Sequence, residues 1–311
     1  MDKNNWCKGD FARHSKMHDW GIGIVVENQR SDKVSIFFEN VGSVKILMLN
    51  LVELTRVDDP GAARLYLENA LIQEPEGTAR DRQPFPIVLQ HFLQDFPNGF
   101  RGEMLKQCER NYKYEVHEWM LQHLDLAQWQ QALNNKGYDN LASDIKRLYG
   151  KTNLLASFEA IKINEAFKDQ EAKVALCNAL FDLLYGTEPI AKRFKETATI
   201  LARYELDKWP IITYPLFIRF PKEHMFIKPT MTQEAALNRG FDIQYSSQIN
   251  WSTYTQVLRF SEDLDKRLSS DSNPDLHPQD MIDIQSFMWC TFGNGWSRDD
   301  IRKEKSRLGL L

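Results

Sequence analysis

The chain has 311 residues, of which 42% are hydrophobic, and a formal net charge of −4 at pH 7. The hydrophobic content allows a packed core, and the length suits two or three domains. The net charge argues against a protein that is basic throughout, although a local basic face stays compatible with it.

The four cysteines, Cys7, Cys108, Cys177 and Cys290, are scattered, and no two of them form a CxxC pair. Free thiols fit a reducing compartment better than a disulfide framework does. No apolar run approaches the roughly 20 residues that cross a bilayer, and the opening MDKNNWCKGD has no signal-peptide pattern. We therefore expect a cytoplasmic protein with no membrane-embedded part.

Residues 9–54 carry short runs of β-branched and aromatic residues, at 11–13, 23–27, 34–38 and 44–48, with turn-forming residues at 28–32 and 40–43. Four or five short strands in so short a segment are too few for a large sandwich core. A small closed or half-closed barrel is the economical solution, because closure removes exposed sheet edges. The sequence therefore predicts a barrel domain over residues 1–57.

The same segment carries a recognisable pattern: GD at 9–10, His14, WGIGIV at 20–25, VSIFF at 34–38 and GSVKIL at 42–47. It resembles the small Tudor-like, SH3-like domain of UvrD-type repair helicases and, more loosely, the RNA-polymerase-interacting domain of CarD-like transcription factors. The resemblance ends near Thr55, and the range 58–311 shows none. His14 and Trp20 are further apart than in that family, and Lys45 lies one place later, so the binding surface could differ.

This resemblance implies a bacterial binding module that docks proteins, including RNA polymerase, or assists in nucleic-acid transactions. Candidate residues for the barrel surface are Trp20, Phe37, Phe38 and Lys45, although at least half of the aromatic residues must fill the core.

Beyond Asp59 the apolar spacing changes to three and four residues, which is typical of helices. We expect a helix over 62–73 and a proline-containing connector over 74–86, followed by a mainly helical domain over 87–311. One helix is predicted to start near Thr152 or Asn153, with Leu155, Phe158 and Ile161 facing inward. Another is predicted over 170–185, capped by Asp169. The sequence thus indicates the α+β class, and the charged tail after Trp296 is mixed in sign.

Residues 209–229 break the helical pattern with four prolines and many aromatic residues. We interpret them as a short β-hairpin, with extended segments at 211–220 and 225–228. Its cations, Arg219, Lys222, His224 and Lys228, alternate with phenylalanines, as in proteins whose aromatic rings stack on bases while cations contact phosphates. The alternative is a half-buried strand with a wet basic face.

The only candidate catalytic pair is Asp280 and Asp283, three residues apart on a predicted helix over 278–292. Such carboxylates could share a face for metal or acid–base chemistry, yet acidic residues are also favoured in the first turn of a helix. No Walker A, nucleophile-elbow, HExxH or kinase motif is present, and we expect no cofactor and no resident metal.

Two hypotheses follow. The favoured one is a non-enzymatic binding or adaptor protein in transcription, repair or defence, with RNA polymerase or a helicase-like protein as its partner and nucleic acid as a further ligand. The alternative is a metal-dependent nucleic-acid-processing enzyme that uses Asp280 and Asp283. The sequence leaves the oligomeric state open.

Overall fold

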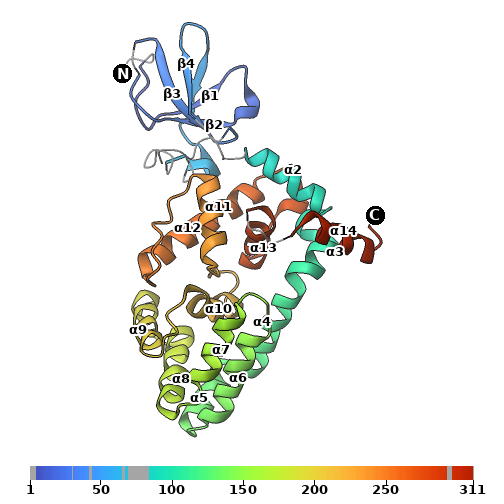
Figure 1. Cartoon of the computed structure of the whole chain (residues 1–311). Coiled ribbons are helices and arrows are strands. Elements are labelled where there is room, and N and C mark those ends of the chain that lie inside the picture. The colour runs from blue at the N-terminus through green and yellow to red at the C-terminus, as the bar shows by residue number, and fades with distance from the viewer. Residues whose placement is uncertain are drawn as a thin grey trace.

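The computed structural model describes residues 5–29, 31–41, 44–64, 67–68, 84–292 and 296–310. Most of the predicted helix over 62–73 and of the connector over 74–86 lies outside these residues. The predicted α+β class is confirmed, because an antiparallel sheet is followed by a mostly helical body (Figure 1).

Five strands form one sheet in the order β4-β3-β2-β1-β5, in which all neighbours are antiparallel. Ile24 of β2 lies opposite both Phe11 of β1 and Phe37 of β3, which fixes the register across the centre. The strands are β1 (Phe11–His14), β2 (Ile22–Val25), β3 (Lys33–Phe38), β4 (Val44–Met48) and β5 (Leu54–Arg56).

Both faces of this sheet are covered. On one face Ile36 and Phe38 of β3 pack with Trp6 and with residues of the turns. On the other face Ile24 and Phe37 pack against Ala63 and Leu67. Ala63 is the last residue of the short 3₁₀ turn η2 (Gly61–Ala63), and Leu67 follows this turn. Successive side chains alternate between two small cores, as the period of a strand requires.

Two glycines allow close packing at β2, one just before the strand and one within it. Gly21 has φ +74°, a conformation that side-chain-bearing residues rarely adopt. A Cβ atom at Gly23 would lie 2.5 Å from Cγ2 of Ile36 and 2.8 Å from the ring of Phe38. The strand pair β2–β3 therefore packs closely only because this position carries no side chain.

The helical body contains thirteen α-helices within the described residues. Their bounds are α2 (Phe85–Asp95), α3 (Glu103–Leu105), α4 (Asn111–His123), α5 (Leu126–Asn134), α6 (Tyr138–Gly150), α7 (Ser157–Ala166), α8 (Gln170–Tyr185), α9 (Ile190–Arg203), α10 (Trp209–Arg219), α11 (Pro229–Arg239), α12 (Trp251–Ser269), α13 (Met281–Thr291) and α14 (Arg298–Arg307). A π-helical turn at Lys106–Arg110 joins α3 to α4, and short 3₁₀ turns lie at His18–Trp20, Gly99–Arg101 and Pro274–Leu276. No described helix has the length and apolar character needed to cross a membrane.

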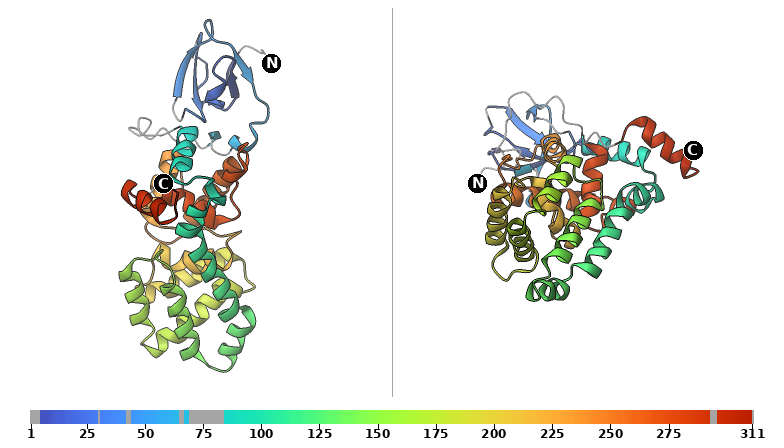
Figure 2. Two further views of the ribbon diagram at one scale, coloured as in Figure 1. Left: turned by 90° about the vertical axis from the view of Figure 1, so that its right-hand side faces the viewer. Right: turned by 60° about the horizontal axis from the view of Figure 1, so that its bottom comes forward.

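The molecule is elongated, with the sheet at one end and α4 to α9 at the other (Figures 1 and 2). The chain runs along the length of the molecule and then returns, so that α2 and α11 to α14 share the middle. There the ring of Phe287 in α13 lies 5.0 Å from that of Phe92 and 6.3 Å from that of Phe85, both in α2. Arg267 of α12 reaches Glu39 of the sheet domain at 3.5 Å.

The predicted hairpin over 211–228 is wrong. Residues 209–219 form α10, whose side chains from Trp209 to Ile218 are all buried, and 225–228 belong to no strand. Pro215 lies inside the helix and cannot donate to the carbonyl of Ile211. The hydroxyl of Tyr149, from α6, donates to that carbonyl instead at 2.9 Å.

Two other helix predictions have different outcomes. Asp169 caps α8, since its carboxylate accepts the backbone N–H of Ala172 at 2.8 Å, as predicted. The helix predicted near Thr152 begins only at Ser157. Leu155, which precedes this helix, is buried as predicted, whereas Phe158 and Ile161 are 58% and 61% exposed, so the prediction that these two face inward is wrong.

Candidate functional site

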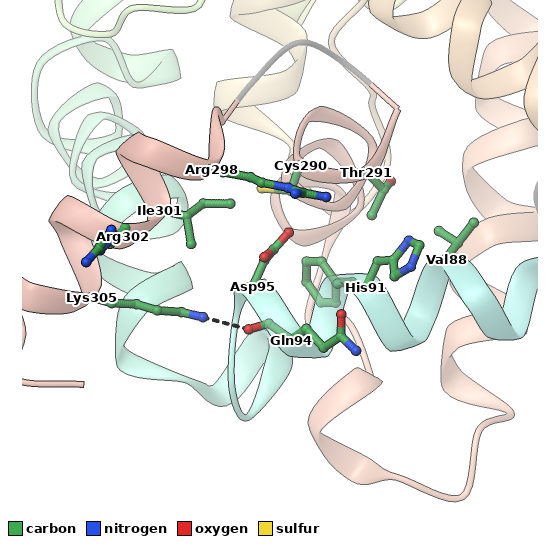
Figure 3. Close-up of a pocket in the computed structure, with 11 residues that line it drawn as sticks. Val88, His91, Gln94, Asp95, Cys290, Thr291, Arg298, Ile301, Arg302 and Lys305 are labelled. Atoms are coloured by element: carbon green, nitrogen blue, oxygen red, sulfur yellow. Dashed lines mark hydrogen bonds between the residues drawn. The ribbon is translucent and has the colours of Figure 1, made fainter. Parts of the chain in front are cut away.

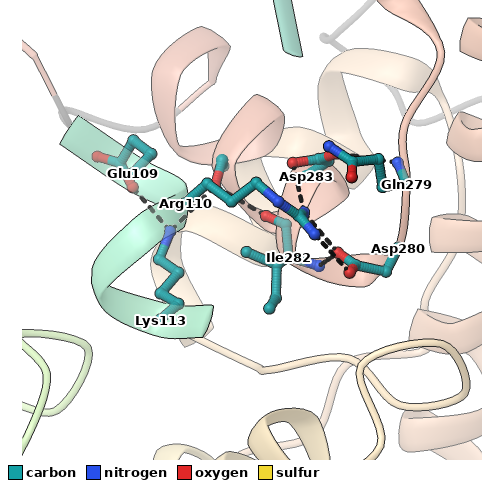
Figure 4. Close-up of polar contacts among 8 residues, drawn as sticks. Glu109, Arg110, Lys113, Gln279, Asp280, Ile282 and Asp283 are labelled. Carbon is teal, nitrogen blue, oxygen red and sulfur yellow. Dashed lines mark hydrogen bonds and ion pairs between the residues drawn. The ribbon is translucent and has the colours of Figure 1, made fainter. Parts of the chain in front are cut away.

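Asp280 and Asp283 do lie together, but a guanidinium group already occupies the space between them (Figure 4). Arg110 donates to both oxygens of Asp280, at 2.9 and 2.8 Å, and to Oδ1 of Asp283 at 2.8 Å. Oδ2 of Asp283 accepts the backbone N–H of Gln279, and Oδ1 of Asp280 accepts that of Ile282. The acidic pair is thus a buried ion cluster, and the hypothesis of an open catalytic pair is not supported by this geometry.

Burial and the charges within this cluster have opposite effects on the pKa values of its members. It raises the pKa of Asp283, and the nearby Arg110 guanidinium acts in the opposite direction. Burial by itself would lower the pKa of Arg110, yet the hydrogen bonds and charges of the two aspartates raise it above its ordinary value. Arg110 therefore stays charged and compensates both carboxylates.

A second buried pair lies beside the first. The ammonium of Lys113, which is fully buried, donates to Glu109 at 2.8 Å and to the hydroxyl of Ser286 at 3.0 Å. The indole N–H of Trp296 donates to the other oxygen of Glu109 at 2.8 Å. Among the described residues, no group of three or more His, Cys, Asp or Glu side chains is placed to hold a metal ion.

The predicted barrel-surface residues divide into two pairs. Phe38 is buried in the core on one face of the sheet, and Phe37 is buried on the opposite face. Neither can contact a partner, so this part of the prediction is wrong. Trp20 is half-buried against Phe38, and the ammonium of Lys45 lies 5.9 Å from its ring.

The cations predicted to line a hairpin have different surroundings in the structure. Arg219 donates to the hydroxyl of Tyr185 at 3.0 Å, Lys222 is exposed, and Lys228 donates to the carbonyl of Leu154 at 3.3 Å. Burial, with a smaller effect of Arg193, lowers the pKa of His224 to about 4. His224 is therefore neutral at pH 7 and offers no charge to a phosphate.

A basic groove lies elsewhere, between α2 and α14 (Figure 3). It encloses a cavity of about 550 Å³. We call it the α2–α14 groove and define it by the side chains of His91, Asp95, Arg298, Ile301, Arg302 and Lys305. Arg298, Arg302 and Lys305 follow one another at intervals of four and three residues, which places them along one side of α14.

The local sequence explains why α14 forms and which side it buries. The hydroxyl of Ser297 accepts the backbone N–H of Asp300 at 3.1 Å and caps the helix. Ile301 is buried and anchors the helix to the body. Ile301 lies three residues after Arg298 and directly before Arg302, so its burial keeps both arginines beside α2, where they line the cavity.

The positive charge of the groove is largely uncompensated. Within the described part of the chain, no acidic side chain forms an ion pair with Arg298 or Arg302, and Asp95 is the one acid that lines the cavity. The ammonium of Lys305 donates to the backbone carbonyl of Gln94 at 2.6 Å, and no acidic side chain of the described residues forms an ion pair with it. The groove can therefore accept an anion.

The sequence of the tail indicates this groove only indirectly, because cations and acids are mixed in it. The tail has acidic residues at 299, 300 and 304 among its cations, so its total charge is unremarkable. Only the helical spacing separates the three groove cations from those acids. That α2 faces them could not be read from the chain, because Gln94 of α2 and its partner Lys305 are 211 residues apart.

Comparison with known proteins reaches only the sheet domain. A family model described as "Protein of unknown function (DUF3553)" matches residues 7–57, which contain all five strands. A search of curated proteins and a search of solved structures found no match.

Proposed function

We propose that this chain is a non-enzymatic binding protein whose α2–α14 groove holds the phosphate backbone of a nucleic acid. The observation that carries the proposal is the row formed by Arg298, Arg302 and Lys305, which faces a cavity with a single acid in its lining. Guanidinium groups suit phosphate because their planar N–H donors can bind two of its oxygens at once.

The arrangement favours a polymer over a single small anion. A helix rises ~1.5 Å per residue, so the three charges are spread over roughly 10 Å along the axis of α14. Arg298 lies in the first turn, where the helix dipole disfavours a cation, so helix stability does not explain its position. A row of unpaired charges suits a ligand whose own charges repeat.

Binding should depend steeply on salt. We expect a labelled oligonucleotide of about 20 nucleotides to bind the full-length protein, with an equilibrium constant that falls linearly in a log–log plot against salt concentration. Three neutralised phosphates correspond to a slope of about −2 to −3. Fluorescence anisotropy over a salt series measures this slope. An absence of binding at low salt, or binding that salt does not weaken, would contradict the proposal.

The sheet domain supports a second role, in line with the barrel of SH3 or Tudor type that the sequence predicts. Its strand β4 is an edge of the sheet, and Val44 and Ile46 on this strand are 38% and 69% exposed. An edge strand offers unpaired backbone N–H and C=O groups to an extended peptide. We assign this edge to an extended segment of RNA polymerase, the partner that the family resemblance implies.

The β4 edge can be tested with one matched pair of variants. Ile46→Lys should weaken binding to purified RNA polymerase at least about 10-fold, because a charge replaces apolar contact at the edge. Leu51→Lys changes a side chain that is 73% exposed but lies beyond β4, and it should bind as the wild type does. Biolayer interferometry compares them. Equal binding by both variants, or binding only to a helicase, would contradict this assignment.

A further inference from the structure

A second cavity of about 550 Å³ opens where α7, α10 and α11 begin. The loop at 245–247 and a residue near the end of α13 complete its wall. We call it the aromatic cleft and define it by the side chains of Phe158, Lys208, Trp209, Lys228, Tyr245 and Trp289. Its volume lies within the range of about 300–1,000 Å³ that is typical of ligand pockets. It shares no lining residue with the α2–α14 groove.

Aromatic rings form much of the cleft. Trp209 is buried, and its indole N–H donates to the carbonyl of Ser246 at 2.8 Å, which fixes the plane of the ring. Trp289 and Tyr245 are half-buried, and Phe158 is exposed in the first turn of α7. Phe158, Tyr245 and Trp289 give a planar ligand faces on which to stack, whereas the buried Trp209 only forms part of the wall.

Positive charge collects at the helix starts. Lys208 is exposed and forms no ion pair with the described residues, while the ammonium of Lys228 lies 5.2 Å from the ring of Trp289. The ammonium of Lys228 donates one hydrogen bond to the carbonyl of Leu154 and has two further N–H donors. α10 and α11 begin without a side-chain cap, so the partial positive charge of their first turns adds to that of the lysines. Glu159 and Glu234 also line the cleft, so an anionic group is favoured only beside the two lysines, at the starts of α10 and α11.

A buried carboxylate in the cleft, that of Glu159, can accept a hydrogen bond from a ligand. Glu159 is 5% exposed, and its Oε2 accepts the backbone N–H of Ala156 at 2.8 Å. Its Oε1 forms no hydrogen bond with the described part of the chain. Burial raises the pKa of Glu159, while the Ala156 N–H, Lys228 and Lys208 act in the opposite direction. The free oxygen can accept a hydrogen bond from an amino group.

We propose that the aromatic cleft binds a nucleoside monophosphate whose base carries an amino group. The base stacks on the aromatic wall, the phosphate meets Lys208 and Lys228, and Glu159 accepts a hydrogen bond from the amino group. This site goes beyond the binding of a nucleic-acid backbone, because it takes a single small molecule at a separate place in the fold.

Isothermal titration calorimetry of the full-length protein tests the ligand class. AMP should bind, and adenosine or inorganic phosphate alone should bind at least about 10-fold more weakly, because each lacks one of the two contacts. UMP, whose base has no amino group, should also bind more weakly than AMP. No heat with AMP at millimolar concentration, or equal affinity for AMP and phosphate, would overturn the proposal.

Two matched pairs of exposed variants locate the site. Phe158→Ser should weaken both AMP and adenosine about 10-fold, whereas Ile161→Ser on the same helix should leave both unchanged. Lys208→Gln should weaken AMP but not adenosine, and Lys195→Gln on α9 serves as its control. If both cleft variants bind AMP as the wild type does, the cleft is not the site.

The α2–α14 groove provides a separate control. A variant with neutralised groove cations should keep its full affinity for AMP, because the two sites share no residue. Loss of AMP binding in that variant would overturn the cleft proposal and leave the proposed nucleic-acid function standing.

Discussion

Replacing Arg298, Arg302 and Lys305 together with glutamine should weaken nucleic-acid binding about 100- to 1,000-fold at low salt. Each lost charge-assisted contact to phosphate removes about 1–1.5 kcal/mol at an exposed site, and about 1.4 kcal/mol corresponds to a tenfold change in affinity. The slope of log K against log salt should fall toward zero, because fewer counterions are released. The same anisotropy series measures both quantities.

The control for this variant removes the same charge elsewhere. Lys195 on α9, Lys266 on α12 and Lys303 on the outer side of α14 are exposed, and none of them lines the groove. Their triple replacement with glutamine should retain most of the affinity. If the two triple variants lose affinity equally, the effect is one of total charge, and the groove has no special role.

Arg110→Met should destabilise the fold by about 3–5 kcal/mol, the usual cost of removing one partner from a buried ion pair. The substitution leaves Asp280 and Asp283 without the guanidinium that donates to both, and their side chains are only 7% and 0% exposed. Urea-induced unfolding followed by circular dichroism gives the change in the free energy of unfolding.

Arg101→Met is the matched control, since Arg101 is exposed and lies 3.9 Å from Asp275. It should cost less than about 1 kcal/mol. A second variant, Arg110→Met with Asp280→Asn and Asp283→Asn, should recover part of the lost stability, because the uncompensated charges are gone. If Arg110→Met costs no more than Arg101→Met, the cluster does not stabilise the fold as we describe.

The sheet was predictable because its information is local. The runs predicted at 34–38 and 44–48 correspond closely to β3 and β4, since alternating apolar residues bounded by turn formers specify a strand without reference to distant parts of the chain. What the pattern could not show is how both sheet faces are used. Phe37 became inaccessible because Ala63 and Leu67 cover it.

α10 was not predictable for the opposite reason. All of its side chains from Trp209 to Ile218 are buried, so the sequence lacks the apolar period by which a helix is usually identified. Pro215 argues against a helix on local grounds. The hydroxyl of Tyr149 that makes it tolerable comes from another helix, and no sequence pattern announces this contact.

In the candidate sites too, the local features were predictable from the sequence and the long-range contacts were not. The spacing of Asp280 and Asp283 correctly placed both at the start of one helix, but their partner Arg110 lies 170 residues away from Asp280. Lys228 was singled out as a cation among aromatic rings, and it does lie beside one, yet Trp289 belongs to α13 rather than to its own segment. In each case the residue was identifiable and its partner was not.

The return of the chain to its middle layer has a consequence for synthesis on the ribosome. The rings of Phe85, Phe92 and Phe100 pack on Phe287, which is translated only after α4 to α12. Helices α4 to α10 can assemble as they emerge, whereas α2 must wait, with its apolar side unsatisfied, until α13 has left the exit tunnel. A nascent chain arrested before α13 should therefore be a substrate for chaperones that recognise exposed aromatic residues.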